Sequence, residues 1–353
     1  MKHKLLLSTA LISGLISGSA AIAQTTVTGN LALQYRAQSF DGTNSKLSTR
    51  GFGRESQINV QNKGKLNTGL DYAAGFSLEF DGNDRARTVN TQSLTQTEAA
   101  SISNENVYID FISGNTTFTV GVDHIQNITT SQVPQIADIM DNVIAGLGGK
   151  ATNGLGANPK EAMGFGVVQR IPGAGLTASA LYAPRAFDYG STDQSISSTN
   201  GTNSAYEVGI VGADTFGIKG LGLRYFTNKT DQDTSAGTDI KGTHYGASYA
   251  MGQFAIGAEK HVQNRTSTTA TTDVDQTSKT IGATFAVSPT VTLGLTHVKT
   301  DISTSIDEKV TSLSVGYNLG PVALVAIASK AENVGINSGR DANELNLRLT
   351  TAF

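Results

Sequence analysis

The 353-residue sequence contains no cysteine, which excludes disulfide bonds, thiolate metal sites and catalysis by a thiol. Only 16% of the residues are charged and the net charge is −3, with no cluster of lysine and arginine. Nucleic acid is therefore not expected as a partner. After residue 23, no apolar run approaches the roughly 18 residues that indicate a transmembrane helix. The chain is then either soluble or inserted in a membrane as strands.

Uncharged polar residues and glycine make up much of the remainder. Hydrophobic residues are only 38% of the chain, whereas glycine occupies 39 positions and Thr, Ser and Asn recur throughout. These residues suit strands with one face in water, and turns that require positive φ angles.

The N-terminal segment has the features of a secretory signal. Lys2 and Lys4 give it a positive start, residues 5–16 are apolar apart from Ser, Thr and Gly, and a small-x-small pattern ends at Ala23. We expect cleavage before Gln24, which lowers the net charge from −3 to −5 because two lysines are removed. The alternative is an uncleaved anchor helix, but the apolar run is shorter than the roughly 20 residues that a bilayer requires.

Apolar and polar side chains alternate most clearly in residues 66–81. Because successive side chains of a strand point to opposite faces, this pattern predicts a strand with lipid on one face and water on the other. The apolar face would carry Leu66, Thr68, Leu70, Tyr72, Ala74, Phe76, Leu78 and Phe80, and the polar face Asn67, Gly69, Asp71, Ala73, Gly75, Ser77, Glu79 and Asp81.

The same period recurs throughout residues 24–353, which we expect to form a single all-β domain. Sixteen strands are predicted, near 27–37, 54–62, 66–80, 104–112, 116–123, 162–170, 175–183, 205–213, 216–227, 243–251, 253–261, 278–287, 290–299, 309–319, 321–330 and 345–353. Short joints, at 62–65, 113–115, 171–174, 214–215, 252, 288–289 and 320, alternate with long ones, at 38–53, 81–103, 124–161, 184–204, 228–242, 262–277, 300–308 and 331–342.

This alternation is what sixteen antiparallel strands require if both termini lie at one end of a closed barrel. Outer-membrane barrels place short turns on the periplasmic side and long loops outside, so we expect periplasmic termini. Closure also removes unpaired strand edges, which a bilayer does not tolerate. A soluble β-sandwich would explain single strands but not the alternation of turns.

Aromatic residues gather near the predicted short turns and the C-terminus, where an interfacial ring is expected in a membrane barrel. The residues concerned are Phe111, Phe118, Phe216, Tyr249, Phe254, Phe285, Tyr317 and Phe353.

The third long loop, about 124–161, differs from the polar loops around it. Ile136, Ile139, Met140 and Val143 follow the i, i+3, i+4, i+7 spacing of a short amphipathic helix, and Pro134 lies just before it. An apolar stripe outside the membrane would be exposed to water unless other residues bury it. We therefore expect this loop to fold into the barrel with its acids towards the pore; the alternative is a helix packed on neighbouring loops.

The sequence shows no pattern of an enzyme or a metal protein. The histidines after the signal, at positions 124, 244, 261 and 297, lack metal-ligand spacing. Residues 148–150, Gly-Gly-Lys, lack both the first glycine and the following Ser or Thr of a phosphate-binding loop. We predict no enzymatic activity and no cofactor.

Taken together, the signal, the sixteen alternating strands, the long third loop and the terminal Phe353 resemble a general bacterial porin of the Gram-negative outer membrane. The resemblance covers the whole mature chain and implies a 16-stranded barrel that assembles as a homotrimer. It also implies contact with outer-membrane lipid and lipopolysaccharide, and a C-terminal strand that presents Phe353 to the barrel-assembly machinery.

In such porins, acids on the third loop face basic side chains on the barrel wall. The matching loop acids would be Asp138 and Asp141, with Glu161 at the end of the loop. The candidate wall bases are Arg36, Arg224 and Arg348 near mid-strand, Arg54 and Lys160 at outer strand ends, and Arg170 beside a turn. They do not form the cluster typical of the family, so the position of a transverse field is left open.

Candidate acids on the lumen face outnumber these bases. They are Asp71, Glu79, Asp110, Asp123, Glu207, Glu259 and Glu344. Because charges of one sign concentrate the opposite ion, weak cation preference is expected, unless most of these acids pair with bases and select little.

The expected function is passive diffusion of small hydrophilic solutes and ions through a water-filled barrel, because 16 to 18 strands leave an aqueous channel. Two alternatives stay open. One is a substrate-specific channel, although most aromatics have lipid-facing parity; the other is an adhesin or structural barrel with a plugged lumen.

Overall fold

The computed structural model describes most of the sequence between Gln24 and Phe353. The described residues are 24–41, 47–82, 100–122, 163–184, 204–231, 238–267, 274–303, 306–333 and 341–353. The predicted signal lies outside them, as does the whole of the predicted third loop, 124–161.

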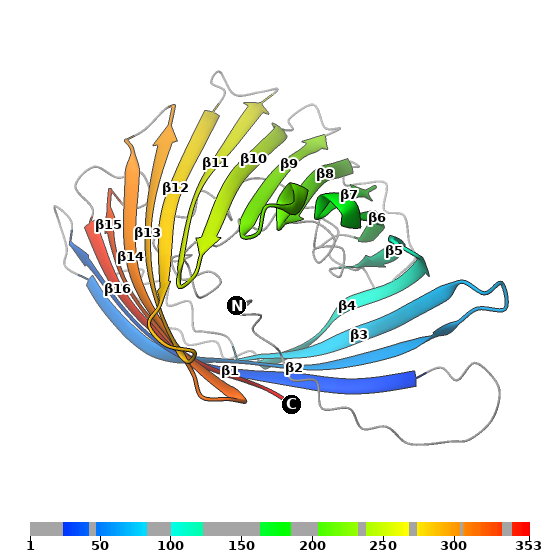
Figure 1. Cartoon of the computed structure of the whole chain (residues 1–353). Coiled ribbons are helices and arrows are strands. Elements are labelled where there is room, and N and C mark those ends of the chain that lie inside the picture. The colour runs from blue at the N-terminus through cyan, green and yellow to red at the C-terminus, as the bar shows by residue number, and fades with distance from the viewer. Residues whose placement is uncertain are drawn as a thin grey trace.

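Sixteen strands form one closed antiparallel barrel, in which β1 pairs with both β2 and β16 (Figure 1). The predicted architecture is therefore confirmed. The strands are β1 Gln24–Asp41, β2 Leu47–Lys65, β3 Asp71–Gly82, β4 Ala100–Ser113, β5 Thr116–Val122, β6 Met163–Ile171, β7 Leu176–Ala183, β8 Ser204–Ala213, β9 Leu221–Asp231, β10 Thr238–Met251, β11 Phe254–Ser267, β12 Val274–Ala286, β13 Val291–Ile302, β14 Glu308–Asn318, β15 Val322–Glu332 and β16 Asp341–Ala352. Within the described residues, two short 3-10 turns, η3 Pro172–Ala174 and η4 Thr215–Gly217, lie between strands.

The alternation in the sequence becomes two faces of the barrel wall. On β16, Leu345, Leu347 and Leu349 are exposed on the outer face, whereas Glu344 and Asn346 are buried on the inner face. Cross-strand register carries these faces from strand to strand, because residues paired across two strands point to the same side. The outer face can thus meet lipid while the inner face lines the lumen.

Several strands extend further towards the long loops than predicted. β1 and β2 remain paired up to Phe40 and Leu47, within the predicted loop 38–53. Likewise β11 continues to Ser267, beyond the predicted end at 261. The polar sequence there shows no alternation, because strand ends that rise above a membrane have water on both faces.

The predicted turn at 62–65 is wrong. β2 runs to Lys65 and the chain turns at 66–70, where Leu66 N–H donates to the carbonyl of Leu70 at 2.8 Å and Gly69 has φ 85°. The predicted strand 66–80 therefore starts only at Asp71. Leu66 and Leu70 continue the apolar alternation through the turn, so the pattern alone does not show where the strand begins.

The predicted start of the ninth strand at 216 is also too early. Residues 214–220 form a longer turn, in which Asp214, Phe216, Gly217 and Gly220 have positive φ. The Asp214 carboxylate accepts a hydrogen bond from Gly220 N–H at 2.8 Å and holds the turn together. β9 begins at Leu221.

A β-bulge lies within β4. Asn106 has φ 52°, and the pairing with β3 shifts between Gly75 and Ser77. The side chain of Asn106 donates to the hydroxyl of Ser77 at 2.8 Å. The bulge reverses the parity of β4, and Tyr108, which follows it, lies on the inner face.

The barrel closes where the two ends of the chain meet. The backbone of Phe353 forms two hydrogen bonds with Gly29, of 2.7 and 2.9 Å. A Cβ atom on Gly29 would lie 2.5 Å from the Phe353 ring, so the ring lies directly over this glycine. The missing side chain of Gly29 thus leaves room for the terminal aromatic residue.

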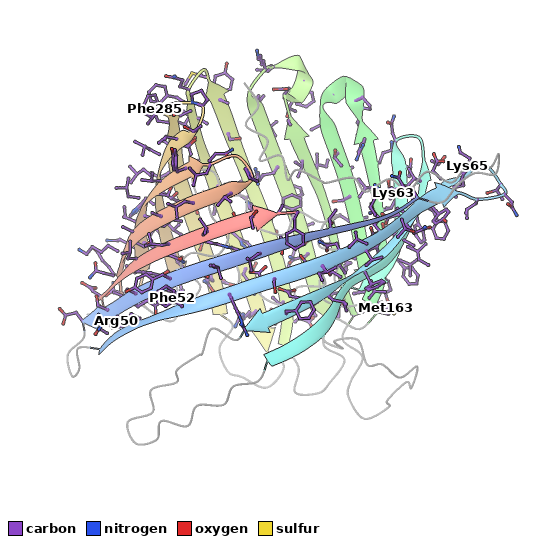
Figure 2. The ribbon with its side chains drawn as sticks, turned by 90° about the horizontal axis from the view of Figure 1, so that it is seen from below. Arg50, Phe52, Lys63, Lys65, Met163 and Phe285 are labelled. Atoms are coloured by element: carbon purple, nitrogen blue, oxygen red, sulfur yellow. The ribbon has the colours of Figure 1, made fainter. Side chains whose placement is uncertain are left out.

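The predicted aromatic ring lies at the turn end of the barrel, on the outer face. Phe254 and Phe285 stack with centroids 4.5 Å apart, and Phe111, Phe118 and Phe165 stack in sequence at 6.4 Å. Figure 2 shows the outer side chains and marks the two ends of β2, with Lys63 and Lys65 at the turn end and Arg50 and Phe52 at the loop end. Among the described residues, no helix is long and apolar enough to cross a membrane.

Candidate functional site

The inner face of β12 to β15 is lined with hydroxyl side chains. Thr280 and Thr296 lie on this face, the hydroxyls of Ser278 and Thr300 lie 2.9 Å apart, and the Ser312 and Ser329 hydroxyls are separated by 2.8 Å. Each hydroxyl both donates and accepts hydrogen bonds. This part of the wall can therefore exchange hydrogen bonds with water or with a hydrophilic solute.

Ion pairs bridge the seam between the first and last strands. Arg36 on β1 lies 2.9 Å from Glu344 on β16, which also accepts a hydrogen bond from Gln38 at 2.6 Å. Nearer the turn end, Arg348 reaches across β1 to Glu55 on β2 at 3.2 Å. Gln34 and Asn346 are hydrogen-bonded at 2.9 Å between the two pairs. The seam is thus linked by side chains as well as by the backbone.

A second charged cluster lies on the inner face of β9 to β11. Glu259 is 4.0 Å from Arg224 and 3.6 Å from Nε2 of His244. The rings of His244 and His261 stack at 5.6 Å, and Phe226 meets His244 edge-on at 5.8 Å. Both clusters place an acid next to an arginine, which reduces the field that either charge alone would create in the lumen.

The structure places the predicted wall bases as follows. Arg36, Arg224 and Arg348 are on the inner face, as expected from alternation. Arg170 has inner parity at the turn end of β6 and is exposed. Lys160 lies outside the described residues.

The assignment of Arg54 to the pore wall is wrong. Arg54 is paired with Leu33 of β1, whose side chain is exposed on the outer face, and it is exposed there too. The reason is parity, because Arg54 has the same parity as Ile58 and Val60 on β2. An arginine at this position meets the membrane surface near the loop end, not the pore.

The predicted wall acids that are described all have inner parity. Glu207 and Glu259 lie towards the middle of the wall and Asp71 lies at the turn end, 3.0 Å from Lys65. Glu79 and Asp110 share the inner face of β3 and β4, where the Thr119 hydroxyl donates to Asp110. Asp123 and the predicted loop acids Asp138, Asp141 and Glu161 lie outside the described residues.

Five charged residues of the wall were not identified from the sequence, among them Lys63 and Lys65, which have inner parity at the turn end of β2. Glu55 is the partner of Arg348, and its inner parity follows from that of Ile58 and Val60. Arg265 and Glu308 are inward on strand ends that had been assigned to loops. Of these residues, only Glu55 could have been identified from the sequence, by its parity relative to Ile58 and Val60.

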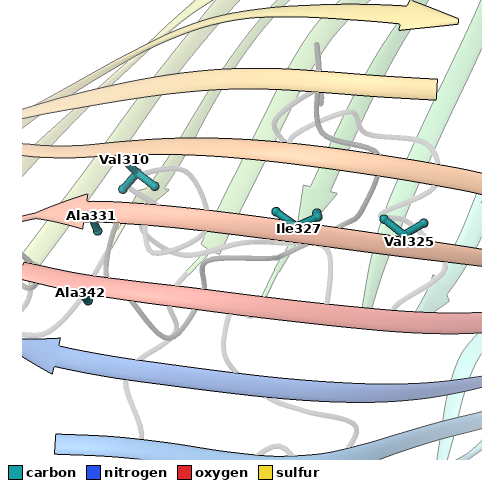
Figure 3. Close-up of a cluster of buried hydrophobic side chains, with 5 residues drawn as sticks. All are labelled: Val310, Val325, Ile327, Ala331 and Ala342. Carbon is teal, nitrogen blue, oxygen red and sulfur yellow. The ribbon is translucent and has the colours of Figure 1, made fainter. Parts of the chain in front are cut away.

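The lumen wall also carries an apolar patch. It consists of Val310, Val325, Ile327, Ala331 and Ala342, with Phe40 and Val298 packed against it. Figure 3 shows these side chains on neighbouring strands, β14 to β16. They have inner parity, so the polar wall is interrupted by a surface suited to an apolar contact.

Among the described residues, no arrangement of side chains indicates catalysis or metal binding. In these segments, no group of three or more His, Asp or Glu could hold a metal ion. Among the histidines that the structure covers, His244 and His261 belong to the wall cluster, and His297 lies on the outer face with Nδ1 2.9 Å from the Thr311 hydroxyl. What the arrangement offers is a hydrophilic passage.

Comparisons with known proteins agree with this description. The sequence model of the Gram-negative porin family matches residues 8–336. None of the curated proteins that were compared matches the chain.

Several solved structures share the fold at low sequence identity. An anion-selective porin from Comamonas acidovorans has a TM-score of 0.68 and 15% identity, covering 94% of this chain and 100% of its own. OmpT of Vibrio cholerae, an outer-membrane protein, has a TM-score of 0.64 and 13% identity, covering 96% and 100%. An in-vitro folded trimer form of OmpT has a TM-score of 0.61 and 15% identity, covering 94% and 99%.

The similarity to these solved structures establishes the fold. The match of the family model over most of the sequence establishes the family. Because that match is joined to a closed 16-stranded barrel, the chain belongs to the Gram-negative porins and forms a porin channel in the outer membrane.

Proposed function

We propose that this porin is a passive diffusion channel for small hydrophilic solutes and ions, and that it catalyses no reaction and needs no cofactor. The observation that carries the proposal is the closed barrel of sixteen strands with a polar inner face. Barrels of 16 to 18 strands leave an aqueous channel, whereas barrels of about eight are filled by their own side chains. Solutes would cross down their concentration gradients.

Weak cation preference follows from the charge of the wall. Away from the turn end, the inner face carries arginines at 36, 224, 265 and 348, and acids at 55, 79, 110, 207, 259, 308 and 344; at the turn end it carries bases at 63, 65 and 170 and an acid at 71. The excess of acids favours cations, because charge lining a pore concentrates the opposite ion. The Comamonas neighbour is named an anion-selective porin, so the wall charges of this chain would give it a different preference.

The third loop would narrow the pore and set much of this selectivity. Asp138 and Asp141, with Glu161 at the end of the loop, would add negative charge to the passage. The apolar patch around Ile327 supports an inward fold, since it offers cover for the stripe of Ile136, Ile139, Met140 and Val143. Burial of apolar surface against apolar surface stabilises such a contact.

The assembly would be a homotrimer with periplasmic termini. One of the solved structures with the same fold is a trimer form, and short turns with long loops match the orientation of outer-membrane barrels. Phe353 would be the residue presented to the barrel-assembly machinery. The outer surface would contact outer-membrane lipid and lipopolysaccharide.

Single-channel recording of the purified, folded protein in planar bilayers tests the function. We expect steady ohmic steps that occur in threes, and weak cation selectivity by reversal potential. Saturable block by one solute would instead indicate a substrate-specific channel, and absence of conductance in folded protein would mean a structural barrel.

The same recording tests the loop acids. Asp138→Asn with Asp141→Asn should shift the reversal potential towards anions, because two negative charges leave the constriction. Asp275→Asn with Glu332→Gln, which removes two acids on the outer face, is the charge-matched control and should shift it less. A reversal potential unchanged in the loop variant would mean that the loop acids do not line the passage.

A further inference from the structure

Three basic side chains have inner parity at the turn end of the barrel. Lys63 and Lys65 lie near the end of β2 (Figure 2), and Arg170 lies near the end of β6. Lys63 is paired with Ala73 of β3, which is 3% exposed on the inner face. All three basic side chains are exposed to water. We call Lys63, Lys65 and Arg170 the turn-end bases.

The turn-end bases give this end of the lumen a net positive charge. Only Lys65 lies next to an acid, Asp71, at 3.0 Å, and both side chains are more than half exposed. Within the described residues, which include all the short turns, Lys63 and Arg170 form no ion pair. Three bases against one acid leave 3 − 1 = +2. The turn 214–220 adds one acid and one base, which cancel.

The rest of the described inner face has the opposite sign. It carries four arginines and seven acids, which gives 4 − 7 = −3. Asp110 lies only three residues before the end of β4. If it is assigned to the turn end instead, the two sums become +1 and −2, so their signs are kept. The described wall therefore consists of two zones of opposite charge in series along the lumen.

The two zones are far enough apart to act separately. On β2, Glu55 and Lys63 share the inner face and are eight residues apart, which at a rise of about 3.3 Å and a tilt of about 40° is about 20 Å of barrel height. The Debye length is about 10 Å at about 0.1 M salt and about 30 Å at about 0.01 M. In dilute salt, the charge of a zone therefore acts across the lumen, whereas more concentrated salt confines it to the neighbourhood of the wall.

We propose that the turn-end bases form an anion-favouring zone in series with the cation-favouring wall, so that the ion preference of the channel depends on which end faces the dilute solution. This rests on the proposed diffusion function. Charge that lines a pore concentrates the opposite ion, and the zone that faces dilute solution is screened least. With dilute salt at the loop end, the acids of the wall dominate and cations pass more readily. With dilute salt at the turn end, the turn-end bases dominate and the preference shifts towards anions.

The test is the reversal potential of single channels in planar bilayers under a KCl gradient of about 0.01 M against about 0.1 M, applied in both directions. The orientation of the folded protein is determined with Thr290→Cys, in the exposed turn before β13. Because the chain has no other cysteine, a biotin maleimide attaches at this position alone. Streptavidin then alters the current only when it is added to the compartment that the turns face.

Two charge-matched double variants are compared. Lys63→Gln with Arg170→Gln, the turn-end variant, removes the two bases that form no ion pair and keeps the pair of Lys65 with Asp71. Lys241→Gln with Lys260→Gln is the control. Lys241 has the parity of Tyr245 on β10, Lys260 is paired with Tyr245, and this tyrosine is 43% exposed on the outer face. The control therefore removes two positive charges outside the lumen.

We expect the wild type and the control to show a cation-to-anion permeability ratio about twofold lower with dilute salt at the turn end than with dilute salt at the loop end. The turn-end variant should show nearly the same ratio in both directions. Lys63→Arg with Arg170→Lys keeps both charges and should retain the difference of the wild type. Equal ratios in both directions for the wild type would overturn the proposal. An undiminished difference in the turn-end variant would also overturn it, because the asymmetry would then come from other residues.

The same recording separates this proposal from the proposed function. A conducting channel with equal ratios in both directions is still a diffusion channel, and only the arrangement in two zones is then wrong. Absence of conductance in the folded protein would instead remove the diffusion function itself, and the two zones with it.

Discussion

At the scale of single residues, a glycine decides where the largest fully buried side chain of the wall can lie. A Cβ on Gly209 would be 2.0 Å from the ring of Phe226, which is 2% exposed and packed against His244. Gly209→Ala should therefore lower the free energy of unfolding by about 1–3 kcal/mol, the usual cost of overpacking. Urea unfolding of the lipid-embedded protein measures the effect.

The control for this substitution is Gly51→Ala on β2, where an added Cβ would meet no atom within 4 Å. In a Phe226→Ala background most of the cost of Gly209→Ala should vanish, because the clashing ring atoms are gone and only the Tyr225 carbonyl oxygen, at 3.1 Å, remains close. If Gly209→Ala and Gly51→Ala unfold at the same urea concentration, the ring does not confine the backbone at this position.

Parity also shows how far the sequence predicts individual residues. Arg36, Arg224 and Arg348 have inner parity in the structure, the face that alternation on their own strands predicts. Arg54 was misplaced, although it has the same parity as Ile58 and Val60, whose apolar side chains indicate the outer face of β2. The pairing of Arg348 with Glu55 could not be predicted, because it depends on the register of three strands that are distant in sequence.

At the scale of elements, the turn between β8 and β9 depends on Gly220. This residue has φ 84°, its N–H donates to Asp214, and its carbonyl accepts a hydrogen bond from Ala250 N–H at 3.0 Å. A Cβ there would lie 2.3 Å from the carbonyl oxygen of Ala250. Gly220→Ala must strain the turn and also displace the neighbouring strand β10.

Gly217 in the same turn supplies a matched comparison. It has φ 76°, but a Cβ would meet no atom within 4 Å. Both alanine variants incur the cost of a left-handed conformation, about 1–2 kcal/mol, and Gly220→Ala should cost at least about 1 kcal/mol more because of the contact. Thermal unfolding distinguishes the two, and equal melting temperatures would contradict the steric account.

The elements themselves were predictable because the bilayer imposes alternation on every strand that crosses it. The number of strands and their faces follow from this constraint. The turn at 66–70 and the loop ends of β10 and β11 did not follow, because alternation continues through the former and is absent from the latter. Asp138 and Asp141 remain predictions, since they lie outside the described residues.

At the scale of the whole molecule, Phe353 joins the last strand to the first. Its ring is 60% exposed and covers Gly29, so Phe353→Ala should lower the stability of the barrel by about 1 kcal/mol, the value expected for the part of the ring that is covered. Resistance of the folded band to SDS as temperature rises measures this. Phe216→Ala is the control, because Phe216 is 65% exposed and lies at a turn away from the seam.

The same variants separate closure from recognition by the assembly machinery. Loss of stability after refolding in lipid without other proteins indicates a role in closure. Normal stability in lipid together with reduced assembly in cells would mean that Phe353 acts only as a signal.

The seam also determines when the barrel can close during synthesis of the chain. Gln34 and Asn346, which are hydrogen-bonded across it, are separated by 312 positions. At about 5–20 residues per second, translation produces the second of them some 15 to 60 seconds after the first. Throughout that interval β1 lacks β16, one of the two strands that it pairs with. The barrel therefore cannot close, and one edge of β1 has no strand to pair with. Hydrophobic residues are 38% of the sequence and alternate with polar ones in the strands, so after residue 23 the unfinished chain exposes no long apolar run.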